Sequence, residues 1–301
     1  MARHRLSRVG HYLLTMCRLF GLLADPIVPA EPWLVTSERS LLRQSDVSPE
    51  VAQKDGWGIA WYDSRRRPHV DKGVHGASDP SEKDRFVGAA RHASGSIVLG
   101  HLRHASNPMK LPHDRLIALE NSQPFVYEGY LFGHNGSIPL PRETRPLLGS
   151  LEPNVRGVND SEVLFWLLVR HMEEIQDPLQ AYTRAVTDLA QVWDDHGRPK
   201  GGPYTGLNVL FSTGPSDLWA FCNWLGDHGT GLIDETRPYY QMVYAANTKQ
   251  VVVGSEPFDA NPKQWKTLDN HRFLHAQAGQ GLVGTTIGEI PLPARISSLS
   301  T

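Results

Sequence analysis

The stretch Met16-Cys17-Arg18-Leu19-Phe20-Gly21 places a cysteine directly after a methionine and at the start of an apolar segment. A chain that began at Met16 and lost that methionine would carry a thiol and a free α-amine on one residue, Cys17. The reference pKa of the amine is about 7.7–8.0, so it can act as a base toward a thiol whose reference pKa is about 8.5. The alternative interpretation is a buried, unreactive cysteine on the first strand of the fold.

Composition limits the classes of protein to which this chain can belong. Its 301 residues are enough for a substantial core, and they carry a formal net charge of -2. This charge gives no indication of nucleic-acid binding, and no apolar run approaches the ~20 residues that span a bilayer. Only two cysteines are present, Cys17 and Cys222, too few for a disulfide framework or a four-cysteine zinc site. Their scarcity favours the cytoplasm.

The first 16 residues are interpreted separately from the rest. They are basic and lack the apolar core of about 7–15 residues and the small-residue cleavage site of a signal peptide. We interpret residues 1–16 as an N-terminal extension, either a mis-assigned start, a pro-segment or a basic tail. Residues 17–301 contain no obvious linker and are expected to form one domain.

The order of predicted elements favours antiparallel sheets. Residues 18–24 are predicted to form a buried strand that leads into a Pro-rich loop, and residues 81–93 a helix with Ser81 as its N-cap. Residues 105–124 are expected to form a long loop. Short strands precede and follow two helices in the middle of the chain, and this order favours antiparallel sheets over a doubly wound parallel sheet.

Four further segments combine polar residues and glycines at predicted strand ends and helix starts. They are Asp55-Gly56-Trp57-Gly58, Gly100-His101-Leu102-Arg103-His104-Ala105-Ser106, Gly133-His134-Asn135-Gly136-Ser137 and Asn159-Asp160-Ser161-Glu162. Taken singly, each has an ordinary structural interpretation. Asp-Gly and Asn-Gly pairs form turns, and Asp160 can cap its helix.

Taken together with Cys17, and in this order, these segments resemble the class II (N-terminal-nucleophile) glutamine amidotransferase domain. The resemblance extends from Cys17 to about residue 260. It implies an α+β fold, a four-layer αββα sandwich of two antiparallel sheets of the Ntn-hydrolase type. It also implies hydrolysis of a γ-glutamyl amide bond through a γ-glutamyl thioester, without a metal or an organic cofactor.

The same resemblance assigns the catalytic residues. Cys17 corresponds to the nucleophile, and Asn135 and Gly136 correspond to the oxyanion hole. A side-chain amide and a backbone N–H suit this role because they donate hydrogen bonds to the oxygen that becomes negative during attack. A glycine also permits close approach of the backbone.

Three more residues are assigned to substrate binding. Arg103 corresponds to the arginine that binds the α-carboxylate, a role that suits a planar guanidinium, and Asp160 to the carboxylate that binds the α-ammonium. Ser106 belongs to the same segment as Arg103. The chain departs from many synthase-linked members at His104 and Ser106, where they have Trp and Thr. It also departs at Asn121-Ser122-Gln123-Pro124-Phe125, where they often have a histidine before the proline.

The second half of the chain points to a stand-alone enzyme. Leu207-Asn208-Val209-Leu210 and Val253-Gly254-Ser255-Glu256-Pro257-Phe258-Asp259 resemble the branch that contains the γ-glutamyl hydrolase of ergothioneine biosynthesis. The expected partner is therefore a small γ-glutamyl substrate. Two alternatives stay open: a glutaminase subunit that delivers ammonia to a separate synthase, and a non-catalytic γ-glutamyl-binding protein.

A zinc site built from histidines is disfavoured. His101 and His104 are three residues apart, and on a strand such residues face opposite sides of the sheet. No HExxH motif and no cysteine-rich ligand spacing is present in the chain.

Overall fold

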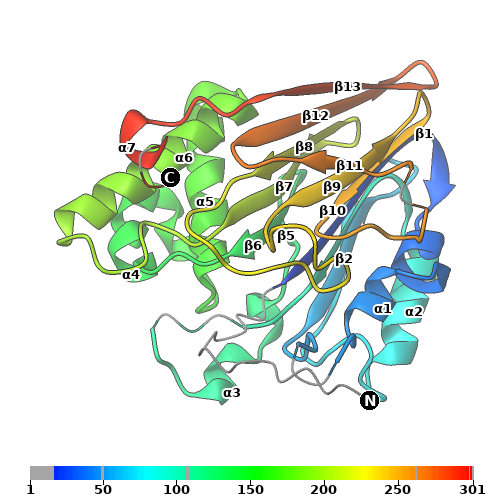
Figure 1. Ribbon diagram of the computed structural model, residues 1–301, viewed down its shortest axis with the longest axis horizontal. Helices are drawn as coiled ribbons and strands as arrows, with labels where there is room; N and C mark the ends of the chain where they lie inside the picture. The colour runs from blue at the N-terminus through cyan, green and yellow to red at the C-terminus, as the bar shows by residue number, and fades with distance from the viewer. Residues whose placement is uncertain are drawn as a thin grey trace, which may run out of the picture.

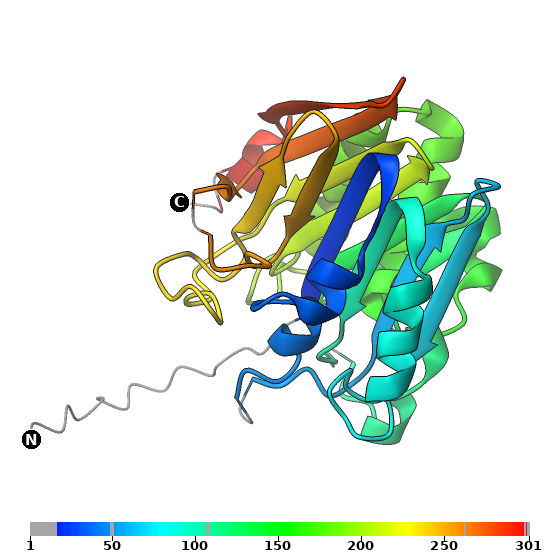
Figure 2. The same ribbon diagram turned by 90° about the vertical axis from the view of Figure 1, so that its right-hand side faces the viewer.

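The computed structural model describes residues 17–48, 51–105, 107, 109–261, 263–297 and 299. Two antiparallel sheets face each other, and helices cover the outer face of each sheet, which gives four layers (Figures 1 and 2). The α+β fold and the αββα sandwich expected from the sequence are confirmed.

The first sheet contains the strand that follows Cys17. Its strands are β1 (Arg18–Pro29), β2 (Trp57–Tyr62), β3 (Pro68–Gly73), β4 (Ser94–Leu102), β9 (Met242–Ala246), β10 (Gln250–Gly254) and β11 (Lys266–Leu268). They lie in the order β11-β9-β10-β1-β4-β2-β3. β1 therefore occupies the middle of the sheet, where it pairs antiparallel with β10 and β4.

The second sheet is built from the middle and the end of the chain. Its strands are β5 (Phe125–Tyr127), β6 (Tyr130–Gly136), β7 (Leu207–Gly214), β8 (Asp217–Cys222), β12 (Arg272–Gly279) and β13 (Leu282–Glu289). They lie in the order β13-β12-β8-β7-β6-β5. Every neighbouring pair in this sheet is antiparallel.

Different helices cover the two sheets. The first sheet packs against η1 (Pro32–Thr36), α1 (Leu41–Gln44) and α2 (Lys83–His92), and the second against α5 (Asp160–Ile175) and α6 (Pro178–Asp195). The remaining short helices are α3 (His113–Leu116), η2 (Leu119–Asn121), α4 (Pro141–Thr144), η3 (Arg145–Asn154) and α7 (Ala294–Ser297). Within the described ranges, every helix is too short or too polar to cross a lipid bilayer.

The alternation of side chains along β6 separates the two cores that flank the second sheet. Leu131 packs between the sheets in one cluster with Leu19 of β1, whereas Phe132 packs on the outer face against Phe165 of α5, with ring centroids 5.3 Å apart. By the same alternation, Asn135 faces the space between the sheets. His134 faces α5.

Three local predictions differ from the structure. Ser81 does not cap α2; its hydroxyl donates to Asp79 Oδ1 at 2.6 Å, and the helix begins at Lys83. β1 continues to Pro29, into the region predicted as a Pro-rich loop. The long loop predicted at 105–124 contains the short helices α3 and η2. In the first case, the hydroxyl is engaged by a carboxylate two residues earlier, so it is not available to the helix.

Candidate active site

Cys17 and Arg103 come together at one end of the first sheet. Cys17 lies directly before β1 and Arg103 directly after β4, and these strands are antiparallel neighbours in which Arg18 pairs with Leu102. One step further along this register places Cys17 opposite Arg103. The Cys17 thiol donates to the carbonyl oxygen of His104, with Sγ and O 3.4 Å apart.

The surroundings of Cys17 keep its thiol protonated at neutral pH. Burial raises the pKa of the Cys17 thiol from 9.0 to about 11, and the negative charge of Asp160 contributes in the same direction. The hydrogen bond with His104 and the positive charges of Arg103 and Arg18 lower this pKa without offsetting burial. Because the thiolate is the nucleophile, reaction at neutral pH requires a base close to the sulfur.

The backbone around Arg103 holds its guanidinium in a defined position. Nη1 donates to the carbonyl oxygens of Asp55 at 3.0 Å and Leu116 at 2.9 Å, and the side chain is buried. Asp55 also accepts a hydrogen bond from the backbone N–H of Ala105 at 2.8 Å. Nε and Nη2 of Arg103 make no hydrogen bond with any residue that the structure describes, so these two donors remain for a carboxylate.

Asn135 is a fully buried amide without a hydrogen bond. Neither Nδ2 nor Oδ1 has a partner in the described part of the chain. Its register partner on β7, Asn208, differs in this respect, because Nδ2 donates to Tyr240 O at 2.6 Å and Oδ1 accepts from Asn223 N at 2.9 Å. Most buried polar groups in proteins are bonded, so Asn135 is an exception in need of an explanation.

Gly136 lies where no other residue fits. Its φ is 156°, and a Cβ at this position would lie 1.8 Å from the carbonyl oxygen of Gly206. The backbone at Gly136 therefore passes closer to the backbone of Gly206 than a residue with a side chain would allow. The residues that follow Gly136 then contact the start of α5 through Ile138.

Asp160 is the first residue of α5 and contacts the segment that follows Gly136. Oδ2 of Asp160 accepts a hydrogen bond from the backbone N–H of Ile138 at 2.7 Å. Asn159 is the N-cap, since its side chain accepts from Ser161 N at 2.9 Å. The helix dipole stabilises the Asp160 carboxylate at this end. The predicted binding residue Ser106 lies outside the described residues.

Comparison with known proteins now assigns the family. Residues 16–290 match the family model of the class II glutamine amidotransferases. The chain belongs to this family. It is similar to the solved structure of a glutamine aminotransferase class-II domain protein from Silicibacter pomeroyi, with 23% sequence identity and a TM-score of 0.61. The match covers 92% of this chain and 100% of that chain, and at this identity the likeness concerns the fold. No curated protein matches the chain.

In this class II amidotransferase, Gln123 supports the strand that carries Asn135. Its Oε1 accepts from His134 N at 2.6 Å, and its Nε2 donates to His134 O at 3.3 Å. His101 Nε2 donates to the same oxygen at 3.2 Å, which joins the ends of β4 and β6. Burial lowers the pKa of His101 to about 3, with help from the charge of Arg103, and also lowers that of His134, so both rings are neutral.

Asn121 connects the end of α3 to the segment that precedes α5. Nδ2 donates to the carbonyl oxygens of Arg115 at 3.1 Å and Leu116 at 3.0 Å, and Oδ1 accepts from Val158 N at 2.7 Å. Its own carbonyl accepts from Asn159 Nδ2 at 2.7 Å. Sequence reasoning assigned no role to Asn121 or Gln123. The sequence signal for such a role was the run of three polar residues directly before Pro124. The structure buries all three of them.

The described histidines form pairs with neighbouring groups and no metal-binding cluster. Among the described residues, no group of three or more His, Cys, Asp or Glu side chains is arranged to hold a metal ion. His101 contacts the backbone of β6, whereas Nδ1 of His104 lies 3.9 Å from the Asp55 carboxylate. These two histidines therefore contact different parts of the structure and do not face a common point.

Proposed function

We propose that this amidotransferase hydrolyses the amide bond of a γ-glutamyl group, in glutamine or a γ-glutamyl conjugate, with Cys17 as nucleophile. The observation that carries the proposal is the unpartnered buried amide of Asn135. An oxyanion hole requires donors that are oriented in advance and not already bonded. The bond from His101 to the backbone of His134 brings the end of β6 to the end of β4, beside the thiol.

Substrate recognition would rest on two opposite charges. The free Nε and Nη2 donors of Arg103 suit the α-carboxylate of the amino acid, and the carboxylate of Asp160 suits its α-ammonium. Charge-assisted hydrogen bonds of this kind are short and about twice as strong as neutral ones. Electrostatic interaction of the Cys17 thiol with both groups supports their proximity to it. A γ-glutamyl group held in this way would extend its far end toward the sulfur.

The proposed reaction begins with proton transfer from the Cys17 thiol to the free α-amine of the same residue. The thiolate attacks the γ-carbonyl carbon, and Asn135 Nδ2 and the Gly136 N–H stabilise the resulting oxyanion. The protonated amine then gives its proton to the leaving nitrogen, and water hydrolyses the thioester. A peptide-bonded nitrogen has no basicity, so this mechanism requires that residues 1–16 be absent. The thiol pKa of about 11 makes such a base necessary.

The test compares two forms of the protein. One is the full chain from Met1, and the other is expressed from Met16, with the first residue of each determined by intact mass. We expect release of glutamate only from the form that begins at Cys17, and modification of Cys17 in that form by the electrophile 6-diazo-5-oxo-norleucine. Hydrolysis by a Cys17→Ala variant would contradict the proposed nucleophile. Equal hydrolysis by a chain that retains Met1 would contradict the role of the amine.

Substrate screening identifies the preferred γ-glutamyl substrate and shows whether a partner protein is needed. We infer a stand-alone hydrolase, as the resemblance of the second half suggests, so hydrolysis should proceed without a partner protein. Glutamine and γ-glutamyl conjugates, among them the hercynyl-cysteine sulfoxide conjugate of ergothioneine biosynthesis, should be compared by kcat/KM. Activity that appears only when a synthase is added would favour the ammonia-delivering subunit. Binding without turnover by the form that begins at Cys17 would favour the non-catalytic protein.

A further inference from the structure

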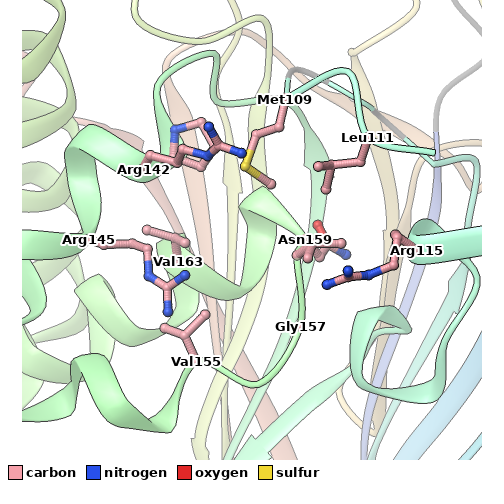
Figure 3. A pocket seen from close by; sticks show the side chains of 11 residues that line it. Met109, Leu111, Arg115, Arg142, Arg145, Val155, Gly157, Asn159 and Val163 are labelled. Carbon is pink, nitrogen blue, oxygen red and sulfur yellow. The ribbon is translucent and has the colours of Figure 1, made fainter. Parts of the chain in front are cut away.

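A pocket of about 190 Å³ lies between α3, α4, η3 and the start of α5 (Figure 3). Met109, Leu111 and Val155 supply apolar wall, and Arg115, Arg142 and Arg145 supply three guanidinium groups. Figure 3 shows Arg142 and Arg145 on one side of the pocket and Arg115 on the other. Neither Arg103 nor Asp160 lines it, so it is distinct from the proposed amino-acid site.

The positive charges of this pocket are largely unbalanced. No lining residue is acidic. The side chains of Arg115 and Arg142 make no hydrogen bond or ion pair with any described residue. Nε of Arg145 is buried without a hydrogen bond, and it lies 3.6 Å from Glu152 Oε1, in a pair whose side chains are both more than a third exposed.

Glu162, which precedes the lining residue Val163 on α5, is already engaged. The carboxylate of Glu162 accepts hydrogen bonds from Arg156 N at 2.9 Å and Gly157 N at 2.7 Å. Its charge is therefore directed at the backbone of its own turn. A concave site with three like charges concentrates positive potential and attracts anions.

We propose that this pocket binds a small anion, a molecule that carries a carboxylate or a phosphate on a compact apolar body. A guanidinium presents paired donors that match both groups, and the apolar wall suits the rest of the ligand. A cavity of 150 Å³ holds a benzene ring, so a pocket of about 190 Å³ accommodates a ligand of roughly six to ten non-hydrogen atoms.

One buried residue, Asn121, holds segments of both the pocket and the proposed amino-acid site. Asn121 bonds the carbonyl of Arg115 and the backbone N–H of Val158, two residues that line the pocket. It also shares the Leu116 carbonyl with Arg103. An anion bound here would thus contact segments whose positions depend on one buried side chain. The proposal concerns binding alone and does not rest on hydrolysis by Cys17.

The test is isothermal titration calorimetry of the full chain with inorganic phosphate and, separately, with succinate, at constant ionic strength set by chloride. We expect saturable binding of at least one probe with a stoichiometry of about one. Arg142→Ala and Arg145→Ala should each weaken it at least tenfold, whereas Arg142→Lys should weaken it less. Arg43→Ala is the matched control, because it removes from α1, on the other side of the molecule, one exposed arginine that makes no ion pair with any described residue (Figure 1).

Each outcome decides the proposal. Preference for phosphate assigns a phosphoryl ligand, and preference for succinate assigns a carboxylate ligand. Absence of saturable binding of both probes to the unmodified chain overturns the proposal. Equal weakening by Arg43→Ala and Arg142→Ala also overturns it, since binding would then reflect diffuse surface charge. None of these results depends on whether the protein hydrolyses glutamine.

Discussion

Arg103 and Asn121 donate to the same oxygen: Arg103 Nη1 lies 2.9 Å and Asn121 Nδ2 lies 3.0 Å from the carbonyl oxygen of Leu116. A carbonyl oxygen has two lone pairs, so both bonds are satisfied at once. The position of the arginine proposed to bind substrate therefore depends on an amide that lies outside the catalytic motif. Substitutions at Asn121 should affect both stability and substrate binding.

Asn121→Asp tests this coupling. The substitution keeps an acceptor for Val158 N but replaces the donating amide with a carboxylate that faces two carbonyl oxygens. We expect the free energy of unfolding in urea to fall by about 2–3 kcal/mol, because buried acceptors lose their donor, and the KM to rise. Asn247→Asp is the control, since exposed Asn247 only accepts from two backbone N–H groups, which a carboxylate also does. A stable variant with unchanged KM would separate Asn121 from Arg103.

Arg103→Lys tests the proposed carboxylate-binding residue. A single ammonium cannot hold the two carbonyls of Asp55 and Leu116 and also present paired donors to a substrate. We expect KM to rise at least tenfold with a smaller change in kcat, a loss of about 1.4 kcal/mol or more of binding. Arg184→Lys on α6 serves as a control for the loss of a guanidinium elsewhere. An unchanged KM would remove Arg103 from the substrate site.

Asn135 and Asn208 form a matched pair for the oxyanion hole. They face each other in register on β6 and β7 and are both buried, but only Asn208 is hydrogen-bonded by the described residues. Asn135→Ala should lower kcat by about 10²–10³ with little change in stability. Asn208→Ala should lower the free energy of unfolding by about 1–3 kcal/mol, because Tyr240 and Asn223 lose their partner. An Asn135→Ala variant that loses stability but keeps its kcat would contradict the proposed role of Asn135.

The pKa of Cys17 predicts slow alkylation of the full chain. Folding raises this pKa from 9.0 to about 11, so the thiolate fraction at pH 8 should be about a hundredfold smaller than in the unfolded chain. The labelling rate with iodoacetamide, followed by mass spectrometry, should keep rising up to pH 11. A plateau near pH 9 would show that the thiol is unshifted.

The same shift has a consequence for stability. The folded state of the full chain favours the protonated thiol, so this contribution to stability is complete below about pH 9. It is lost as the pH rises toward 11. Cys17→Ala removes the contribution, and the loss of stability between these pH values should be smaller in that variant. Burial also raises the pKa of Cys222. Because Cys222 is present in both proteins, its contribution cancels when their stabilities are compared.

Local sequence patterns predicted individual strands and helices, whereas the layered fold came from the family resemblance. The buried strand predicted at residues 18–24 is the first part of β1, and the helix predicted at 81–93 corresponds to α2, Lys83–His92. Short edge strands such as β5 and β11 were not predicted. Each is three residues long, and its strand conformation depends on the neighbour with which it pairs.

The sequence by itself determined the order of the motif residues and, through resemblance, the family and the sandwich architecture. Only the tertiary structure revealed how the site is supported. Arg18 Nη1 donates to Tyr239 Oη at 2.7 Å across 221 positions of sequence, and Asn121 reaches Val158 across 37. Propensity and periodicity are properties of neighbouring residues, whereas burial and hydrogen-bond partners arise from segments that meet only when the chain folds. The free amide of Asn135 and the arginine pocket belong to this second kind of information.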